Sequence, residues 1–488
     1  MDVAQHRAVA PRGAAAGPPA GPPMRPREAA LRRSSGARLR AGNAVRLLRN
    51  GREAYGEWLT EIATARRWVH LENYIFRDDH VGRLFADVLC ERAEAGVRVR
   101  VLVDWYGSYD VPGSFWEGMR ARGVDVRLVN RFSPARPLGV FRRDHRKTLG
   151  VDGRYASAGG ICIADEWLER SPDTGLPYRD TSLGLRGPAV ADVERAFAGV
   201  WDLNGAPLPP EERPDAAEIP PAGDTPVRVV VQEPGRLRVL RLLQLLAAGV
   251  EERIWLADAY FLSVPSLNQS LISAAQDGID VRVLTPGTLD VPVVGPLART
   301  GYTALLEAGV RIWEYRGLMM HAKTSVVDGW SGRVGSTNMN VTGLLTNWEL
   351  DLVVEDAGFG AAMEAMFLED LADARPVLLR PGGRLSPPPP PREGLRPPGS
   401  RRGRSRDTGA RAVAAAASSG TAALSGEALD RNERRVVGTI GAGLALVAAA
   451  GARHPRLLAW PLAVVSGLLG SAGVRRALRS APADPGRG

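Results

Sequence analysis

Two histidine–lysine pairs stand out because an aspartate follows each at the same distance. The segments HRKTLGVD (145–152) and HAKTSVVD (321–328) both have the pattern HxKxxxxD and begin 176 residues apart. They hold the only two lysines among 63 Lys and Arg residues, and two of the six histidines. In an extended strand, residues i and i+2 face the same side. The spacing therefore predicts that the histidine and lysine of each segment project into one pocket.

Two imidazoles and two ammonium groups suit chemistry on a phosphodiester. Of His145 and His321, one can attack phosphorus and form a covalent intermediate. The other can protonate the leaving alkoxide and then deprotonate the incoming hydroxyl. Lys147 and Lys323 would neutralise the non-bridging oxygens as charge builds up in the transition state. This scheme uses no metal ion and no cofactor, and the residues alone do not rank the two histidines.

Further polar residues follow the second motif at spacings that suit a phosphate site. Ser336 and Asn338 in the run GSTN have the i, i+2 spacing and could donate hydrogen bonds to the phosphate. Glu349 comes eleven residues after Asn338. A buried carboxylate can hold an imidazole in one tautomer. We therefore expect Glu349 to orient a catalytic histidine.

The first half has different residues at the matching positions. The run GGIC places Gly160 and Cys162 where the second half has Ser336 and Asn338, and Asp180 is the expected carboxylate. We include Gly160 in the candidate phosphate-binding and orienting set. Cysteine is a weak hydrogen-bond donor, so the first half-site is expected to lack one phosphate donor. The alternative is that Cys162 is simply a small buried core residue.

The elements around the motifs also repeat. The runs WVHLENYIF and IWLADAYFL are each followed by a helical stretch and then by GVRVRVL (96–102) or GIDVRVL (278–284). A further pair of strand-like runs starts at Gly123 and at Gly309. Strands that alternate with helical stretches predict an α/β sheet covered by helices. A duplicated unit can place two half-sites face to face across a pseudo-twofold axis, so one shared site is expected.

Three stretches rich in proline, glycine and arginine divide the chain. The predicted segments are a disordered basic segment (1–43), a first domain (44–204), a linker (205–226), a second domain (227–380), a Pro/Arg-rich linker (381–426) and a hydrophobic hairpin (427–488).

The net charge of +9 is unevenly distributed. Residues 1–43 carry +6 and residues 380–488 carry +12, which leaves −9 for residues 44–379. An acidic body argues against a nucleic-acid partner. Arginine-rich ends favour an anionic membrane surface as a partner. The alternative is that both ends are solvated segments of biased composition.

The C-terminal hydrophobic segment has two uncharged runs, 436–452 and 457–474. Their 17 and 18 residues are at the short limit for spanning a bilayer. More arginines flank the pair than lie between the two runs, which predicts that both ends, and with them the catalytic body, are cytoplasmic. A re-entrant hairpin and two helices packed on the body are the alternatives.

These motifs resemble the phospholipase D superfamily, which has a duplicated HxKxxxxD with a trailing GSxN-type segment. The resemblance covers about residues 44–375. The runs HLENYIFRDDHVGRLFADVL, FRRDHRKTLGVDGR, GGICIADEW, RDTSLGLRGPAV and MHAKTSVVDG are similar to bacterial cardiolipin synthases. Two motifs in register with an independent repeat make this resemblance specific.

The resemblance implies two tandem phospholipase D-like α/β/α sandwich domains related by pseudo-twofold symmetry. It implies transfer of a phosphatidyl group from one phospholipid to a glycerol hydroxyl of phosphatidylglycerol, at a bacterial membrane. By analogy with the family, His145 is the nucleophile and His321 the acid/base. Asp152 and Asp328 complete the six motif residues, and the family implies that these two are structural anchors.

Two departures from the family and three rival functions remain. Family members usually have asparagine where Cys162 stands, and many begin with transmembrane helices, which we do not expect in the N-terminal residues of this sequence. The rival functions are a phospholipase D-like hydrolase that uses water as acceptor, a phosphodiesterase acting on nucleic acid, and a membrane scaffold with a decayed site.

Overall fold

The protein is described by a computed structural model that covers residues 28–131, 142–168, 177–262, 264–289, 294–317 and 319–389. The hydrophobic hairpin predicted at 427–488, and the Pro/Arg-rich linker beyond residue 389, lie outside the described residues.

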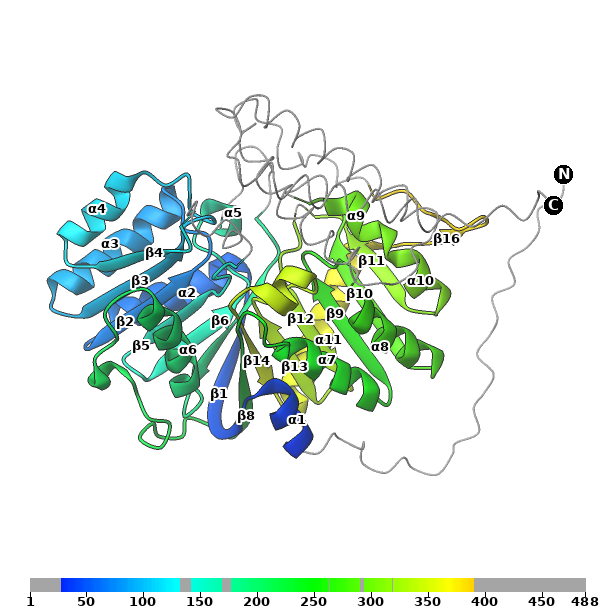
Figure 1. Ribbon diagram of the computed structural model, residues 1–488, viewed down its shortest axis with the longest axis horizontal. Helices are drawn as coiled ribbons and strands as arrows, with labels where there is room; N and C mark the ends of the chain where they lie inside the picture. The colour runs from blue at the N-terminus through cyan, green and yellow to red at the C-terminus, as the bar shows by residue number, and fades with distance from the viewer. Residues whose placement is uncertain are drawn as a thin grey trace, which may run out of the picture.

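Fifteen strands form one continuous mixed sheet that runs through both halves of the molecule (Figure 1). The strands of the first half are β1 (Leu39–Arg49), β2 (Trp68–Asn73), β3 (Arg98–Asp104), β4 (Asp125–Val129), β5 (Thr148–Val151), β6 (Tyr155–Gly159) and β7 (Thr181–Arg186). Those of the second half are β8 (Thr225–Gln232), β9 (Arg253–Asp258), β10 (Asp280–Pro286), β11 (Arg311–Tyr315), β12 (Lys323–Val327), β13 (Ser331–Gly335), β14 (Glu349–Val354) and β15 (Ala374–Pro376). A separate two-stranded ribbon contains β16 (Leu379–Arg380) and β17 (Arg384–Leu385).

The strand order is repeated outward from the central antiparallel pair β1–β8. On one side the order is β1-β7-β6-β5-β2-β3-β4, and on the other it is β8-β14-β13-β12-β9-β10-β11, followed by β15. Strands β2, β3 and β4 pair in parallel in the first half, as do β9, β10 and β11 in the second half. All other neighbouring strands of the sheet pair antiparallel. The predicted α/β class is confirmed, and the repeated order supports the pseudo-twofold relation.

Helices cover both faces of the sheet, with α7 and α8 in front of the second half and α11 behind it (Figure 1). The helices of the first half are α1 (Glu28–Ser35), α2 (Asn50–Ala63), α3 (His80–Glu94), α4 (Gly113–Ala121), α5 (Asp165–Leu168) and α6 (Val190–Leu203). Those of the second half are α7 (Arg238–Gly249), α8 (Pro265–Gln276), α9 (Val294–Thr300), α10 (Tyr302–Glu307) and α11 (Ala357–Ala372). A 3-10 turn η2 (Pro210–Glu212) and a π-helical turn η3 (Thr342–Thr346) complete the set.

Four glycines explain why the same short strand motif recurs. Gly96, Gly123, Gly278 and Gly309 each lie two residues after the end of a helix and have φ between 89° and 95°. Only glycine adopts this left-handed conformation without steric cost, so it ends a helix and turns the chain into the next strand. The repeated glycine-valine runs are therefore helix ends joined to strand starts.

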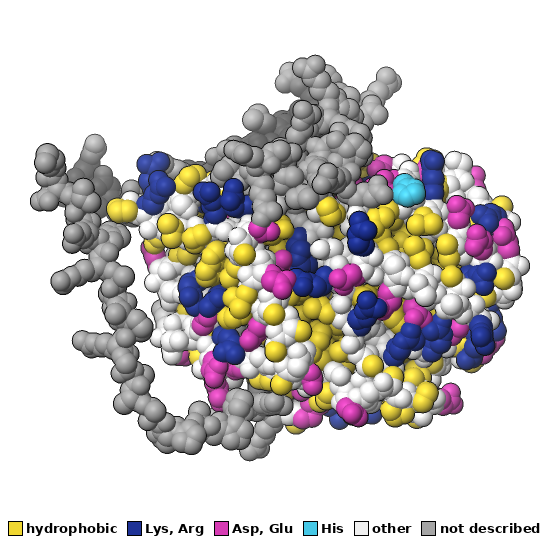
Figure 2. All heavy atoms as spheres, turned by 180° about the vertical axis from the view of Figure 1, so that it is seen from behind, with side chains coloured by type: hydrophobic (Ala, Val, Ile, Leu, Met, Phe, Trp, Pro, Cys, Tyr) yellow, Lys and Arg dark blue, Asp and Glu magenta, His cyan; other side chains and the backbone are white. Residues whose placement is uncertain are grey.

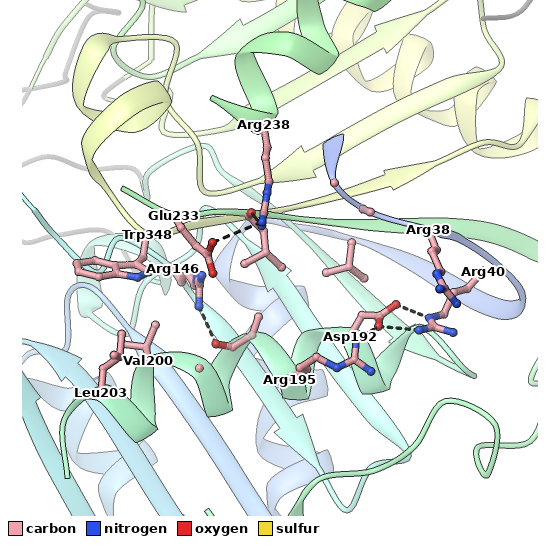
Figure 3. A pocket seen from close by; sticks show the side chains of 16 residues that line it. Arg38, Arg40, Arg146, Asp192, Arg195, Val200, Leu203, Glu233, Arg238 and Trp348 are labelled. Atoms are coloured by element: carbon pink, nitrogen blue, oxygen red, sulfur yellow. Dashed lines mark hydrogen bonds and ion pairs between the residues drawn. The ribbon is translucent and has the colours of Figure 1, made fainter. Parts of the chain in front are cut away.

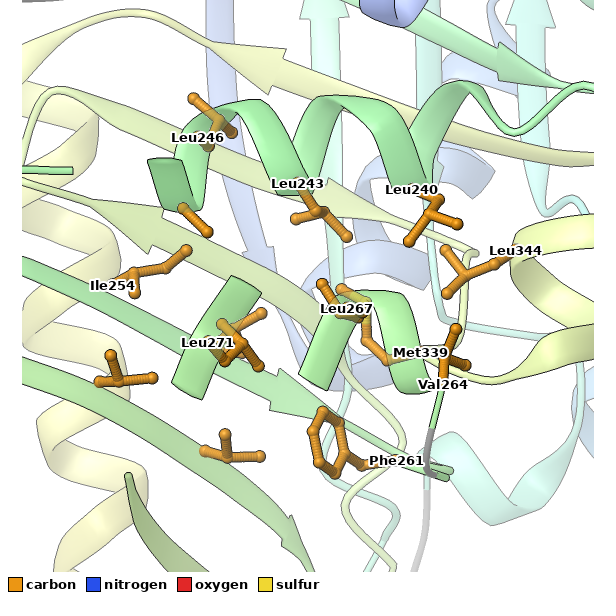
Figure 4. Close-up of a cluster of buried hydrophobic side chains, with 14 of the residues drawn as sticks. Leu240, Leu243, Leu246, Ile254, Phe261, Val264, Leu267, Leu271, Met339 and Leu344 are labelled. Atoms are coloured by element: carbon orange, nitrogen blue, oxygen red, sulfur yellow. The ribbon is translucent and has the colours of Figure 1, made fainter. Parts of the chain in front are cut away.

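Each half has its own hydrophobic core, and a third core joins the halves. Figure 4 shows the core of the second half, where Leu243 of α7 and Leu267 and Leu271 of α8 pack with Ile254 of β9. The joining core combines side chains of both halves, including Ala156, Leu183, Val334, Leu352 and Met366. Burial of this shared surface holds the two halves in one fixed arrangement.

Two expected segment boundaries differ from the structure. Residues 28–43 were expected to be disordered, but they form α1 and the start of β1, and buried Arg228 pairs with Glu28 at 2.6 Å. The linker at 205–226 is packed against the first half, because Glu212 lies 2.6 Å from Arg100 and 3.0 Å from His70. A sequence rich in breakers can still be ordered when its polar side chains find buried partners.

Candidate active site

The four motif side chains that could do chemistry lie together where the two halves meet. His145 and Lys147 lie in an extended segment just before β5, and Lys323 is the first residue of β12. His145 and His321 are 7% and 6% exposed, and both lysines are at most 1% exposed. The charges of both lysines lower the pKa of each histidine. The structure thus brings both HxK pairs into one buried site.

Each histidine is held by a carboxylate from the opposite half of the chain. His145 Nδ1 lies 3.0 Å from Glu349 Oε2, and His321 Nδ1 lies 2.7 Å from Asp180 Oδ2. In both pairs the Nδ1–H is the natural donor to the carboxylate, so Nε2 is left to face the substrate. The carboxylates were expected to orient imidazoles, and their crossed assignment is a finding of the structure.

The backbone explains the crossing, because the two motif segments run beside strand ends of the other half. The amide of His145 donates to the carbonyl of Trp348 at 2.9 Å, and the amide of His321 donates to that of Arg179 at 2.7 Å. Each contact places a histidine next to the residue that precedes the partner carboxylate. The catalytic geometry is therefore built into main-chain pairing between the halves.

The lysines are held at the base of the site by their own motif backbone. Lys147 Nζ donates to the carbonyl oxygen of His145, and Lys323 Nζ donates to that of His321. The Nζ of Lys147 also lies 4.9 Å from the ring centroid of Tyr74, which contacts His145 edge-on at 4.6 Å. These contacts fix each ammonium group beside the imidazole that its motif supplies.

The hydroxyl of Ser336 donates a hydrogen bond to the carboxylate that orients His145. Ser336 Oγ donates to Glu349 Oε2 at 2.5 Å, and Asn347 Nδ2 donates to Glu349 Oε1 at 3.1 Å. This contact is of the orienting kind, and a direct role of Ser336 in binding the phosphate stays a prediction. Asn338 is buried, and its Oδ1 has no hydrogen-bond partner within the described residues. Its phosphate-binding role stays a prediction.

Gly160 makes room for the other carboxylate. A Cβ at Gly160 would lie 2.2 Å from Asp180 Oδ1, so any larger residue would displace Asp180. Trp167 Nε1 donates to Asp180 Oδ2 at 2.8 Å and so takes the place of the serine in the second half. Cys162 is fully buried in the core of the first half, which fits its reading as a small core residue.

The motif aspartates lie at the far ends of strands β5 and β12. Asp152 accepts backbone N–H bonds from residues 66, 67 and 68 at 2.8–2.9 Å, and Asp328 accepts from residues 251, 252 and 253 at 2.8–3.0 Å. Both have positive φ, 55° and 46°. Each aspartate stands five positions after the lysine of its motif, which is roughly 16 Å along an extended chain. This placement supports the anchor role and leaves the chemistry to the other four residues.

Comparisons with known proteins agree with this geometry. Residues 242–371 match the family model described as "Cardiolipin synthase, PLD-like domain". The chain is 32% identical over 340 residues to cardiolipin synthase of Geobacillus sp. (strain WCH70), covering 68% of this chain and 67% of that protein. It is 31% identical over 346 residues to cardiolipin synthase A of Pseudomonas syringae pv. syringae (strain B728a), covering 69% and 70%.

The chain belongs to the cardiolipin synthase family. The fold also matches the crystal structure of a phosphatidylserine synthase from Haemophilus influenzae Rd KW20, with a TM-score of 0.58 and 15% identity over 71% of this chain and 91% of that one. The predicted membership of the phospholipase D-like enzymes is thereby confirmed. Within the residues that the structure covers, no helix is both long and apolar enough to cross a bilayer.

The electrostatics of this family member's site distinguish the two histidines. Burial, followed by the charges of the two lysines, lowers the pKa of His145 well below its usual value. Burial and Lys323 lower the pKa of His321 too, but Asp180 opposes this shift. Burial works against ionisation of Asp180, yet the charge of His321 and its hydrogen bond outweigh it and lower the pKa of Asp180. His321 therefore lies beside an ionised carboxylate that stabilises its protonated form.

Two further groups in this cardiolipin synthase-type site titrate near neutral pH. Burial raises the pKa of Glu349 to about 7 and lowers the pKa of Lys323 to about 8. Glu349 is thus close to half-ionised at pH 7, and Lys323 keeps its charge up to about pH 8. Perturbed groups of this kind are typical of functional sites.

Aromatic rings beside the histidines were not predicted as site residues. Tyr74 contacts His145, and Trp167 contacts His321 edge-on at a centroid distance of 5.3 Å. Tyr260 lies 6.4 Å from the ring of His321. The one sequence signal was that both tyrosines stand at matching strand ends, a position that packing alone also explains.

The middle residue of the first motif belongs to a different cavity. Arg146 donates from its guanidinium to the carbonyl of Ala196 at 2.8 Å, in the direction opposite to its neighbours His145 and Lys147. It lines a cavity of about 520 Å³ together with Trp348 and several arginines (Figure 3). Arg146 thereby fastens the motif segment to α6 and leaves the phosphate site to the histidines and lysines.

Proposed function

We propose that this chain makes cardiolipin by moving a phosphatidyl group from one phospholipid to a glycerol hydroxyl of phosphatidylglycerol. The observation that carries the proposal is the pair of crossed dyads, His145–Glu349 and His321–Asp180, with a buried lysine beside each histidine. Two oriented imidazoles are what a two-step displacement needs, one as nucleophile and one as acid and base. Family membership supplies the substrate class.

The first displacement forms a covalent enzyme. His145 Nε2 attacks the phosphorus of phosphatidylglycerol, the bond from phosphorus to the head-group glycerol oxygen breaks, and His321 gives its proton to that oxygen. Glycerol leaves, and the phosphatidyl group stays on His145 as a phosphohistidine. Lys147 and Lys323 offset the charge on the non-bridging oxygens.

The second displacement reverses these roles. His321 removes a proton from the glycerol hydroxyl of a second phosphatidylglycerol, whose oxygen attacks the phosphorus, and the bond from phosphorus to His145 breaks. The products are cardiolipin and the free enzyme, so atoms and protons balance over the cycle. The strongly lowered pKa of His145 supports its role as nucleophile, because a neutral ring has a free lone pair.

The reaction is tested by its products. Purified full-length protein is incubated in mixed micelles with phosphatidylglycerol labelled in the head-group glycerol and in an acyl chain. We expect equal amounts of free glycerol and cardiolipin. Phosphatidic acid as the only lipid product would replace the synthase with a hydrolase, and absence of turnover would favour a decayed site.

The assignment of the histidines is tested with a phosphatidyl ester of p-nitrophenol, whose leaving group needs no proton. We expect His321→Ala to release about one equivalent of nitrophenol per enzyme and then stall, because the covalent enzyme forms but is not discharged. His145→Ala should release none. The opposite pattern would make His321 the nucleophile.

Attachment to an anionic membrane surface through the arginine-rich C-terminal segment remains part of the proposal. Deletion of residues 427–488 should move the protein from the membrane pellet to the supernatant at moderate salt. Retention of the truncated protein in the pellet would show that residues 1–426 contact the membrane instead. The cytoplasmic side is proposed from the arginine distribution alone.

A further inference from the structure

A cavity in the second half lies next to the catalytic site. It has a volume of about 530 Å³ and opens where the loops after β9 and β10 meet α9 and α10. Its wall is mostly apolar, and the apolar and aromatic lining side chains include Tyr260, Phe261, Leu289, Val294, Pro296 and Tyr302. A cavity of this size and lining suits part of a lipid-sized molecule.

One residue connects the cavity to the catalytic site. Tyr260 lines the cavity, and its ring also lies 6.4 Å from the ring of His321. The cavity therefore begins one aromatic ring away from His321. In the proposed reaction the oxygen at His321 belongs first to the leaving glycerol and then to the incoming lipid.

The polar groups in the cavity wall are paired with each other. Tyr302 Oη donates to Thr285 Oγ1 at 3.2 Å, and Thr285 Oγ1 donates to the carbonyl of Trp313 at 3.3 Å. Arg299 and Glu314 form an ion pair. Because these groups are satisfied inside the protein, the wall presents hydrocarbon-like surface to an occupant. This chemistry favours an acyl chain over a charged head group.

The first half has one more aromatic ring than the second half at the positions that match the start of α10. At the 186-residue offset that relates Gly123 to Gly309, Phe115 corresponds to Gly301 and Trp116 to Tyr302. In the first half Phe76, Phe115 and Trp116 pack against one another with centroid distances of 5.1–5.9 Å. The half that supplies His321 thus has a glycine where the other half has the ring of Phe115.

We infer that this cavity binds an acyl chain of the acceptor phosphatidylglycerol and so favours transfer to a lipid hydroxyl over transfer to water. The inference rests on the proposed function, in which the acceptor approaches from the His321 side. In phosphatidylglycerol a glycerophosphate unit separates the reacting hydroxyl from the acyl esters. That spacing places a chain beyond Tyr260, where the cavity begins.

Gly295→Leu fills the cavity and tests the inference. A Cβ at Gly295 would meet only Leu289 Cδ1, at an ordinary 3.5 Å, so α9 should accept the larger side chain. Gly118→Leu is the matched control, because Gly118 is exposed on α4 and has nothing within 4 Å. Ala298→Leu, on the cavity side of α9, is a second filling variant. Thermal unfolding confirms that each variant is folded.

The measured quantity is the ratio of cardiolipin to phosphatidic acid formed from phosphatidylglycerol. We expect Gly295→Leu to lower this ratio about tenfold, since each excluded methylene is worth roughly a fourfold change in affinity. Nitrophenol release from the activated ester should be unchanged, as should both quantities in Gly118→Leu. An unchanged product ratio, or an equal loss of nitrophenol release, would overturn the inference.

A binding measurement separates failure of the cavity from failure of the function. Dioctanoyl phosphatidylglycerol below its critical micelle concentration and the deacylated glycerophosphoglycerol are titrated into wild type and Gly295→Leu by calorimetry. We expect wild type to prefer the acylated compound by at least about tenfold, and the variant to lose that preference. If wild type makes no cardiolipin but shows this preference, the function fails and the chain site stands. If no preference is found, the chain site fails.

Discussion

Asp180 Oδ2 lies 2.7 Å from Nδ1 of His321, although 141 residues separate the two in the chain. The same crossing joins His145 to Glu349 at 3.0 Å. Each half therefore contributes a histidine that the other half orients. A chain with one copy of the motif could build this site only as a homodimer, in which each copy orients the histidine of the other.

The crossed carboxylates predict a large loss of activity on a near-isosteric change. Asp180→Asn keeps the shape of the side chain but removes the charge that stabilises protonated His321, and it no longer requires the Nδ1–H tautomer. We expect kcat to fall roughly ten-thousandfold, the loss found when the orienting acid of a triad is replaced by asparagine. Asp165→Asn on the nearby α5 is the control, and it should stay within about threefold of wild type in the same assay. A loss of less than tenfold in Asp180→Asn would mean that His321 does not depend on this carboxylate.

The two lysines predict that arginine is no substitute. Lys147 and Lys323 are buried, at most 1% exposed. The guanidinium of arginine is larger than an ammonium group and donates its hydrogen bonds in a planar fork. We expect Lys147→Arg and Lys323→Arg each to lower kcat about a hundredfold in the cardiolipin assay, although the charge is retained. The exposed swap Arg195→Lys should have no effect. Full activity in both lysine variants would show that charge alone is sufficient.

The motif aspartates predict a loss of stability without a loss of chemistry. Asp152→Ala removes an acceptor for three backbone N–H groups, so the free energy of unfolding should fall by about 1–3 kcal/mol or more. Asp152→Gly loses the same bonds but relieves the left-handed backbone at φ 55°, so the difference between the variants isolates the backbone strain. Denaturant unfolding measures both. A drop in kcat of folded Asp152→Gly beyond about threefold would contradict a purely structural role.

The site predicts a narrow pH optimum for kcat/KM with the phosphatidyl ester of p-nitrophenol, whose leaving group takes no proton from His321. Glu349, with a pKa of about 7, must lose its proton to accept fully from His145, so activity should rise with pH through about 7. Lys323, with a pKa of about 8, loses its charge at higher pH, so activity should fall through about 8. The strongly lowered pKa of His145 leaves that ring neutral over this whole range.

Ser336→Ala tests the assignment of the acidic limb. Loss of the 2.5 Å hydrogen bond to Glu349 removes a donor that favours the ionised carboxylate, so the limb should move to higher pH. Ser331→Ala at the start of β13 is the control and should leave the profile in place. An acidic limb that does not move in Ser336→Ala would assign that limb to another group.

Much of the fold and the site was predictable because its signals are local. The glycines at 96, 123, 278 and 309 end helices and start strands, and the doubled motif marked His145 and His321 as partners. Burial of both histidines and both lysines at one interface agrees with the predicted shared site.

The remainder depends on contacts that the linear sequence does not encode locally. The crossing of the dyads is set by main-chain pairing of residue 145 with 348 and of residue 321 with 179. The hydroxyl of Ser336 had two possible acceptors, and only the position of Glu349 decides between them. Residues 28–43 have a composition typical of disorder, but tertiary contacts order them, because β1 pairs with both β7 and β8.

The unbroken sheet has a consequence for how substrates reach the histidines. The β1–β8 pairing and the joining core connect the two halves, so we expect that the halves do not separate to open the active site between turnovers. Both lipids must therefore reach the histidines without relative movement of the halves, the first product leaving before the second substrate enters. We therefore expect turnover to be limited by the exchange of the first product for the second lipid.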